Sequence, residues 1–167
     1  MAYTTPTTRA TSDSITAAIW NADMVDNIIH IHEDLPAARV YHNTTQSMTI
    51  ATDNIVLFNS ERYDTDTLHS TVSNTGRMTI ATAGVYMFVV NIEWSTVPTT
   101  CELEFRLNGT TKVAWQSFVG STKRCTLVTV YEMAIADYME VICNPVSTQT
   151  ILSTANYSPE YMCHRIG

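Results

Sequence analysis

One histidine pair in the sequence has the spacing of a metal site: His30 and His32, with Glu33 directly after them. Imidazole and carboxylate groups are ligands of transition metals, and in a strand residues two positions apart share one face. The pair falls, however, in a segment with helical periodicity, where that spacing turns side chains to different faces. We therefore expect histidines that face solvent or an interface rather than a metal centre.

Acidic side chains form two further groups. Glu61, Asp64 and Asp66 carry the oxygen ligands that calcium takes, but only their composition suggests such a site, and aspartates are ordinary turn formers. Glu102 and Glu104 share one face of a predicted strand. We expect that face to be solvated.

Other signs of catalytic chemistry are missing from the sequence. The four cysteines, at positions 101, 125, 143 and 163, form no Cys-x-x-Cys pair, so we expect free or partly buried thiols; three disulfide pairings are nevertheless open. His42, His69 and His164 are scattered, and the sequence contains neither a glycine-rich phosphate loop nor a Gly-x-Ser-x-Gly elbow. The sequence thus predicts no catalytic residue, metal or cofactor, and a protein that is not an enzyme.

Composition limits the partners of the chain. Its 167 residues suit one domain with a short appendage, and its net charge is −7 with only two lysines, Lys112 and Lys123. With no basic stripe, direct binding of nucleic acid is disfavoured. No apolar run approaches the roughly 20 residues that span a bilayer, and the polar N-terminus has no hydrophobic signal core. We expect neither membrane insertion nor a secretion route of its own.

The N-terminal part reads as a polar arm, residues 1–13, followed by a helix. Five apolar residues recur at helical steps of three or four and form one stripe: Trp20, Met24, Ile28, Ile31 and Leu35. Ser14 or Thr16 can cap this helix, and Pro36 ends it. The stripe has two interpretations, packing on the chain's own β domain or contact with a partner, either as a trimer seam or as a docking surface.

From Arg39 onward the apolar pattern has a period of two, which predicts strands. Short strands are expected at 48–50 and 55–58. Residues 77–94 should form two strands around a turn at Ala83-Gly84, with the second buried on both faces because both parities are apolar. Asn108-Gly109 predicts a hairpin turn. Short strands at regular spacing indicate a sandwich or barrel.

The segment from Gly76 through Gly84 to Tyr86 and Phe88 resembles the hallmark of one jelly-roll family, which joins the globular heads of the first complement component to tumour-necrosis-factor-like trimers. Residues 103–109 and the turn Ala136-Asp137-Tyr138 resemble further parts of that pattern. The resemblance covers about 125 residues. It implies an antiparallel jelly roll that closes as a homotrimer, with Gly84 at a crowded turn and the aromatic side chains in the core. No calcium site is carried over.

A second resemblance lies in the segment from Ile15 to Ile28, which is similar to a short helix near the N-terminus of tailed-phage tail or head accessory proteins. The predicted anchor helix carries these site residues: Trp20, Asn21, Met24, Asn27, Ile28, Ile31 and Leu35.

Together these patterns predict an all-β protein: an antiparallel jelly-roll sandwich at 37–167, preceded by an arm and anchor helix at 1–36. The expected function is that of a phage virion structural protein, a trimeric capsid decoration, head fibre or tail-associated protein. Residues 1–36 would dock on other virion proteins, and the jelly roll would project outward and contact the host surface. The alternative is a soluble, complement-head-like ligand-recognition module, against which the absence of a collagen repeat argues.

Overall fold

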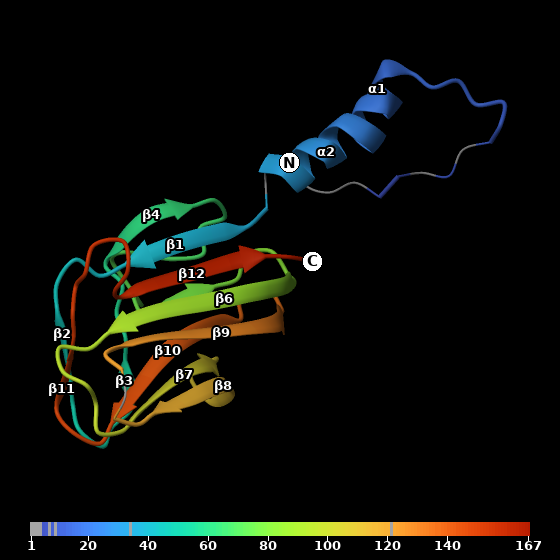
Figure 1. Cartoon of the computed structure of the whole chain (residues 1–167). Coiled ribbons are helices and arrows are strands. Elements are labelled where there is room, and N and C mark those ends of the chain that lie inside the picture. Colours follow the sequence, from blue (N-terminus) through green and yellow to red (C-terminus); the bar gives the residue numbers. More distant parts are fainter. Residues whose placement is uncertain (1–4, 7, 9, 34, 121) are drawn as a thin grey trace. The chain divides into compact units, whose positions relative to one another are not determined.

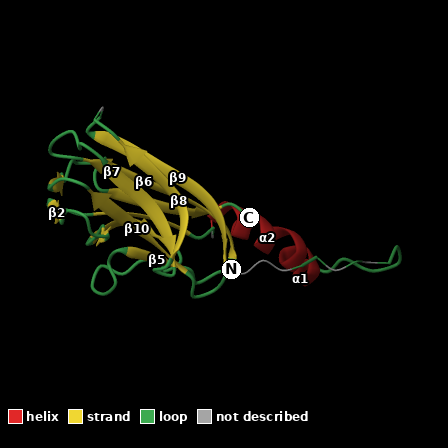
Figure 2. Ribbon diagram, turned by 90° about the horizontal axis from the view of Figure 1, so that it is seen from below, coloured by secondary structure: helices red, strands yellow, loops and turns green. Residues whose placement is uncertain are grey.

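The computed structural model describes residues 5, 6, 8, 10–33, 35–120 and 122–167, with the backbone alone for residues 30–33. The chain divides into two compact units, Met1–Leu35 and Pro36–Gly167. Helices are confined to the first unit, while the second consists of strands and loops (Figure 2).

The first unit contains one helical segment in three parts: α1 (Ala17–Trp20), the π-helical turn η1 (Asn21–Val25) and α2 (Asp26–Glu33). Thr16 caps it, because its hydroxyl accepts a hydrogen bond from the N–H of Ile19 at 3.3 Å. The N–H of Asp26 donates to the carbonyl of Asn21, five residues back, so the predicted uninterrupted α-helix is wrong at this turn. The helix also ends at Glu33, which leaves Leu35 outside it, just before Pro36.

The second unit is a sandwich of two antiparallel sheets (Figure 1). The first, called here the β6 sheet, has the order β4 (Ser60–Asp64), β1 (Ala37–Tyr41), β12 (Glu160–Arg165), β6 (Gly84–Glu93) and β9 (Arg124–Met133). The second, the β10 sheet, has the order β3 (Asn54–Ile55), β10 (Tyr138–Pro145), β7 (Cys101–Leu107) and β8 (Thr111–Phe118), with β5 (Arg77–Thr79) also paired to β10. A small third sheet pairs β2 (Gln46–Met48) with β11 (Gln149–Ile151).

The predicted jelly roll is confirmed, because sequence-distant strands alternate between two sheets as that fold requires. Two short strands differ from prediction: β2 ends at Met48, and β3 ends at Ile55. The chain from Val56 to Phe58 leaves the ladder, although the N–H of Val56 still donates to Val141 and that of Phe58 to Thr75.

The core lies between the two sheets and is centred on aromatic rings. Tyr161 packs against Phe58, Phe88 and Phe105, with ring centroids 5.3, 6.2 and 5.8 Å apart. All four side chains are fully buried, and the Tyr161 hydroxyl donates to the carbonyl of Met139 at 3.2 Å. The two sheets thus share one aromatic cluster, whose members come from four separate parts of the sequence.

The left-handed backbone conformation occurs at two turns that the sequence singles out. Asn108 and Gly109 have φ angles of 51° and 72°, as expected for the predicted hairpin turn. Ala136 stands where the resembled family has glycine, yet its φ is 71°. A side chain with a Cβ is strained in that region, so the turn at Ala136 is held by its neighbours rather than by its own preference. Asp137 contributes, since its carboxylate accepts from the N–H of Ala134 and from the side chain of Asn108.

Candidate assembly surfaces and polar clusters

The outer face of the β6 sheet carries an apolar patch. Met87 lies opposite Val130, and Val89 lies between Val128 and Met162. Residues opposite each other in antiparallel strands share a face, so these five side chains, named here the outer patch, lie side by side. Met87, Val128 and Val130 are 36%, 51% and 53% exposed in the single chain.

The outer patch corrects one prediction. Strand β6 was expected to be buried on both faces, but in the single chain only the parity of Tyr86 and Phe88 is buried. The other parity is only partly covered in the single chain and carries both apolar and polar residues: Val85, Met87, Val89, Asn91 and Glu93. A sheet that faced only water would alternate apolar and polar residues along its strands. The outer patch departs from that pattern and is the kind of apolar surface found where proteins associate.

The outer face of the β10 sheet differs in character. Glu104 was expected to be solvated, but it is only 3% exposed, because Arg106 and Lys112 bind its carboxylate. Arg106 also pairs with Asp53 at 2.8 Å, and this contact lowers the pKa of the Asp53 carboxyl. On this face the charges of Glu104, Arg106 and Asp53 neutralise one another, while Trp115, opposite Glu104, is 57% exposed.

The four residues of the family hallmark lie inside the jelly roll. Tyr86 and Phe88 are fully buried in the single chain, so their side chains fill the core and cannot touch a partner. A Cβ on Gly76 would stand 2.3 Å from Cγ2 of Ile55, and one on Gly84, where φ is 157°, would stand 2.4 Å from the carbonyl oxygen of Gly167. Both glycines thus permit close approach of another chain segment.

In the N-terminal unit the predicted anchor residues divide by exposure. Trp20, Met24 and Ile28 are 53%, 45% and 60% exposed. Asn21 is exposed too, whereas Asn27 is buried and its amide donates to the carbonyl of Asp23 at 3.2 Å. Leu35 is half-buried, and the side chain of Ile31 lies outside the described residues. Part of the stripe borders an apolar hollow of about 280 Å³, lined by Pro6, Ile15, Ile19, Trp20, Asp23 and Met24.

Among the described side chains, the candidate metal groups do not assemble. Asp64 uses both carboxylate oxygens on backbone N–H groups, those of Asp66, Leu68 and His69, so it organises its loop. Glu61 is hydrogen-bonded to His69 at 2.9 Å. His30, His32 and Glu33 lie in helix α2, and their side chains are outside the described part of the chain. Within the described residues, no three of His, Cys, Asp or Glu are grouped to hold a metal.

The four cysteines are free thiols and all are buried. The sulfur atoms of Cys101 and Cys143 are 3.3 Å apart. Burial raises the pKa of the Cys125 thiol to about 12, which keeps it protonated and unreactive at neutral pH.

A polar cluster that the sequence analysis missed lies at one end of the β6 sheet. Glu160 is 1% exposed, and two arginines bind its carboxylate, with Arg39 Nε at 2.6 Å from Oε2 and Arg62 Nε at 2.8 Å from Oε1. The Arg62 guanidinium lies over the ring of Tyr41, 4.6 Å from its centroid. The partners are 98 and 121 residues apart, so only pairing of β1, β4 and β12 brings them together.

Comparison with known proteins supports the fold through structure alone. No family model matches the sequence, and no curated protein matches it either. Among solved structures, the Eiger TNF from S. frugiperda is 12% identical over 81% of this chain and 94% of that one, with a TM-score of 0.64. The globular domain of the zebrafish complement 1qA protein is 17% identical over 80% and 98%, with a TM-score of 0.58.

The PRD1 vertex protein P5 is also similar, at 10% identity over 80% of this chain and 97% of that one, with a TM-score of 0.57. In the described residues, no helix is long and apolar enough to cross a membrane. At sequence identities this low, structural similarity shows the fold alone. The second unit of this chain has the antiparallel jelly-roll fold of tumour-necrosis-factor-like and complement-head proteins.

Proposed function

We propose that this chain is a structural protein of a phage-like virion. In this proposal the jelly roll forms a homotrimer through the outer patch and projects from the particle, while residues 1–36 attach to other virion proteins. The observation that carries the proposal is the presence of two separate exposed apolar surfaces, one on each compact unit. Each unit thus has its own surface to bury.

The outer patch supports the homotrimer. An apolar area on one face of a compact domain is removed from water when copies associate, and closed ring symmetry limits the association to a fixed number of copies. The resemblance to the complement-head and tumour-necrosis-factor family implies three. The charged outer face of the β10 sheet would then remain in solvent, because its ion pairs are satisfied within the chain.

The helical unit supports the attachment. Trp20, Met24 and Ile28 present apolar side chains on a segment that contributes nothing to the jelly-roll core. A short helix is marginal in water by itself, and a partner surface that buries its apolar stripe stabilises it. The likeness of this segment to phage accessory proteins, and the jelly-roll fold of the PRD1 vertex protein, favour a virion as the location.

The proposal is tested by removing residues 1–35 and assaying particles for the chain. The expected product is a folded trimer that no longer attaches. A variant with both Trp20→Asp and Met24→Asp is the finer test, because both side chains are exposed and the jelly roll stays unchanged. Undiminished attachment of either form would overturn the proposed anchor.

The alternative function, a ligand-recognition module of the complement-head type, is favoured by the likeness to the zebrafish 1qA globular domain, which concerns the fold alone. The same particle assay separates the two. A recognition module would be absent from particles even with residues 1–36 intact.

A further inference from the structure

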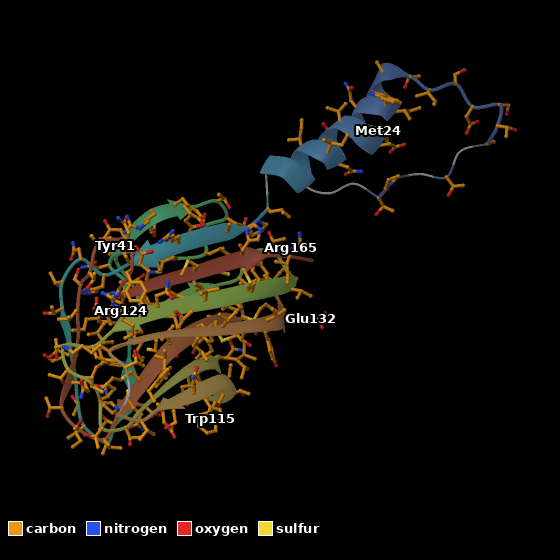
Figure 3. All side chains as sticks on the ribbon, in the orientation of Figure 1. Met24, Tyr41, Trp115, Arg124, Glu132 and Arg165 are labelled. Atoms are coloured by element: carbon orange, nitrogen blue, oxygen red, sulfur yellow. The ribbon has the colours of Figure 1, made fainter. Side chains whose placement is uncertain are left out.

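A polar pocket of about 320 Å³ lies at the end of the sandwich where β1 ends and β12 begins. Its lining includes Tyr41, Asn43, Arg62, Thr154, Asn156 and Glu160, and it is called here the distal pocket. Pro36, which follows the first unit, lies next to the opposite end of β1. Figure 3 places Tyr41 and Arg124 at one end of the jelly roll and Glu132 and Arg165 at the other. The distal pocket therefore lies at the end of the jelly roll opposite Pro36.

The ion-pair cluster at the distal pocket has a net positive charge, with Arg62 and Glu160 in the lining and Arg39 outside it. Glu160 is buried with Arg39 and Arg62 on its two oxygens, so one carboxylate faces two guanidinium groups. Nε and one terminal nitrogen of Arg62 bind Glu160, and within the described chain the second terminal nitrogen has no acceptor. The Arg62 side chain is 31% exposed, so this nitrogen can meet a ligand. Glu93, which binds the Thr154 hydroxyl, is paired with Arg124 at 3.0 Å and adds no net charge.

The remaining lining consists of the His42 imidazole and of residues rich in hydrogen-bonding groups. Tyr41, Thr154 and Asn156 offer hydroxyl and amide groups that donate and accept. Asn156 has a φ of 62°, which fixes its position in a tight turn, and its carbonyl accepts from Arg39 at 3.4 Å. Groups of this kind match the hydroxyls of a sugar, and a single surplus positive charge matches one carboxylate. A phosphate monoester carries about −1.5 to −2 at pH 7 and would be under-neutralised here.

We infer that the distal pocket binds one acidic sugar residue, a carboxylate-bearing monosaccharide of the kind found in surface glycans. This inference rests on the proposed function, because it gives the outward-facing end of the jelly roll a ligand on a host surface. Arg62 holds the carboxylate, and Tyr41, Asn43 and Asn156 hold the hydroxyls. Glu160 is a positioning residue, since its buried carboxylate keeps both arginines in place.

The test uses the full chain with D-glucuronate as the probe and D-glucose as its neutral counterpart, followed by ligand-observed NMR titration. Glucuronate should bind saturably with a Kd on the order of 1–10 mM, corresponding to about 3–4 kcal/mol, and glucose at least about fivefold more weakly. Sodium acetate, which has the carboxylate without the ring, should bind more weakly than glucuronate. Equal binding of glucose and glucuronate, or no saturation by glucuronate, would overturn the inference.

Two variants locate the binding. Asn156→Gly removes the amide while glycine keeps the positive φ, and it should raise the Kd for glucuronate about 3- to 10-fold, the value of one hydrogen bond. Asn74→Gly is the matched control: Asn74 has a φ of 52° and lies elsewhere. It should leave the Kd unchanged. Arg62→Gln should abolish the preference for glucuronate over glucose. Tyr41→Phe, which keeps the ring beneath Arg62 and removes one hydroxyl, should raise the Kd for glucuronate about 3- to 10-fold even if Arg62→Gln does not fold.

An unchanged Kd in Asn156→Gly would place the sugar elsewhere and overturn the assignment. Failure of this inference is distinguishable from failure of the proposed function. A chain that attaches to particles but binds no glucuronate loses only its ligand, whereas a chain that binds glucuronate but is absent from particles contradicts the virion role.

Discussion

Replacing Val128 and Val130 together by aspartate should dissociate the proposed trimer without unfolding the chain. Both side chains belong to the outer patch, and about half of each is still exposed in the single chain. Full burial of a valine side chain contributes about 1.5–3 kcal/mol, so the exposed half of each is worth about 1 kcal/mol on assembly. Two valines in three copies make the loss on the order of 6 kcal/mol, or about 10⁴-fold in the association constant.

Aspartate adds a second penalty, because six carboxylates would have to be buried without a designed partner. The folded single chain tolerates them, since a substitution at an exposed strand position costs within about 1 kcal/mol. Val72→Asp is the matched control: Val72 is 90% exposed and lies outside the patch. It introduces the same change of side chain at a site that assembly leaves in water.

Light scattering at several concentrations measures the outcome. The wild type and Val72→Asp should have three times the chain mass of 18.6 kDa, about 56 kDa. The double variant should have the mass of one chain and still unfold cooperatively, at a lower temperature because association no longer stabilises the folded state. A double variant that keeps the trimer mass would show that the outer patch is not the interface. A wild type with the mass of one chain would refute the trimer itself.

Three further outcomes test the account of the jelly roll. Ala136→Gly should stabilise the fold by about 1 kcal/mol in a urea titration, because glycine adopts the φ of 71° without strain; a loss of stability would contradict that strain. The side chain of Asn108 and the N–H of Ala134 hold the pKa of the Asp137 carboxyl below its ordinary value, so its contribution is present above about pH 4 and is lost as pH falls through the lowered pKa. The stability advantage over Asp137→Asn should therefore shrink between about pH 5 and pH 2 in acid titrations, and an advantage that grows would reverse the sign of the argument. Finally, a thiol reagent at neutral pH should leave the native chain unlabelled and label all four cysteines after unfolding, whereas fewer labelled thiols would reveal a disulfide.

The sheets could be predicted from the sequence because the patterns that indicate them are local. Alternation in β7, the Asn108-Gly109 turn and the spacing from Gly76 to Phe88 each depend on neighbours along the chain. The exposure of the outer face of β6 could not be predicted from the sequence. Valine is common in buried strands, so the residue type of Val128 and Val130 does not indicate exposure. Only their pairing with Met87 and Val89 shows which face these side chains share.

Ion pairs between side chains could not be predicted from the sequence either. The sequence predicts that Glu104 is a solvated strand residue, whereas in the structure Arg106 and Lys112 bind its carboxylate and bury it. Nothing in the sequence distinguishes Glu160 from the other acidic residues, although its carboxylate binds Arg39 and Arg62 from two other strands. In the helical segment, periodicity predicts the α-helix but carries no signal for the π turn at Asn21–Val25.

Electron microscopy of the particles that carry this chain tests the virion role most directly. We expect density with three-fold symmetry at the particle surface, in which three jelly rolls project outward. Their distal pockets should point away from the particle, and residues 1–36 should contact a neighbouring virion protein. Particles that lack the chain, or that hold it as single copies docked through the jelly roll, would contradict the central claim.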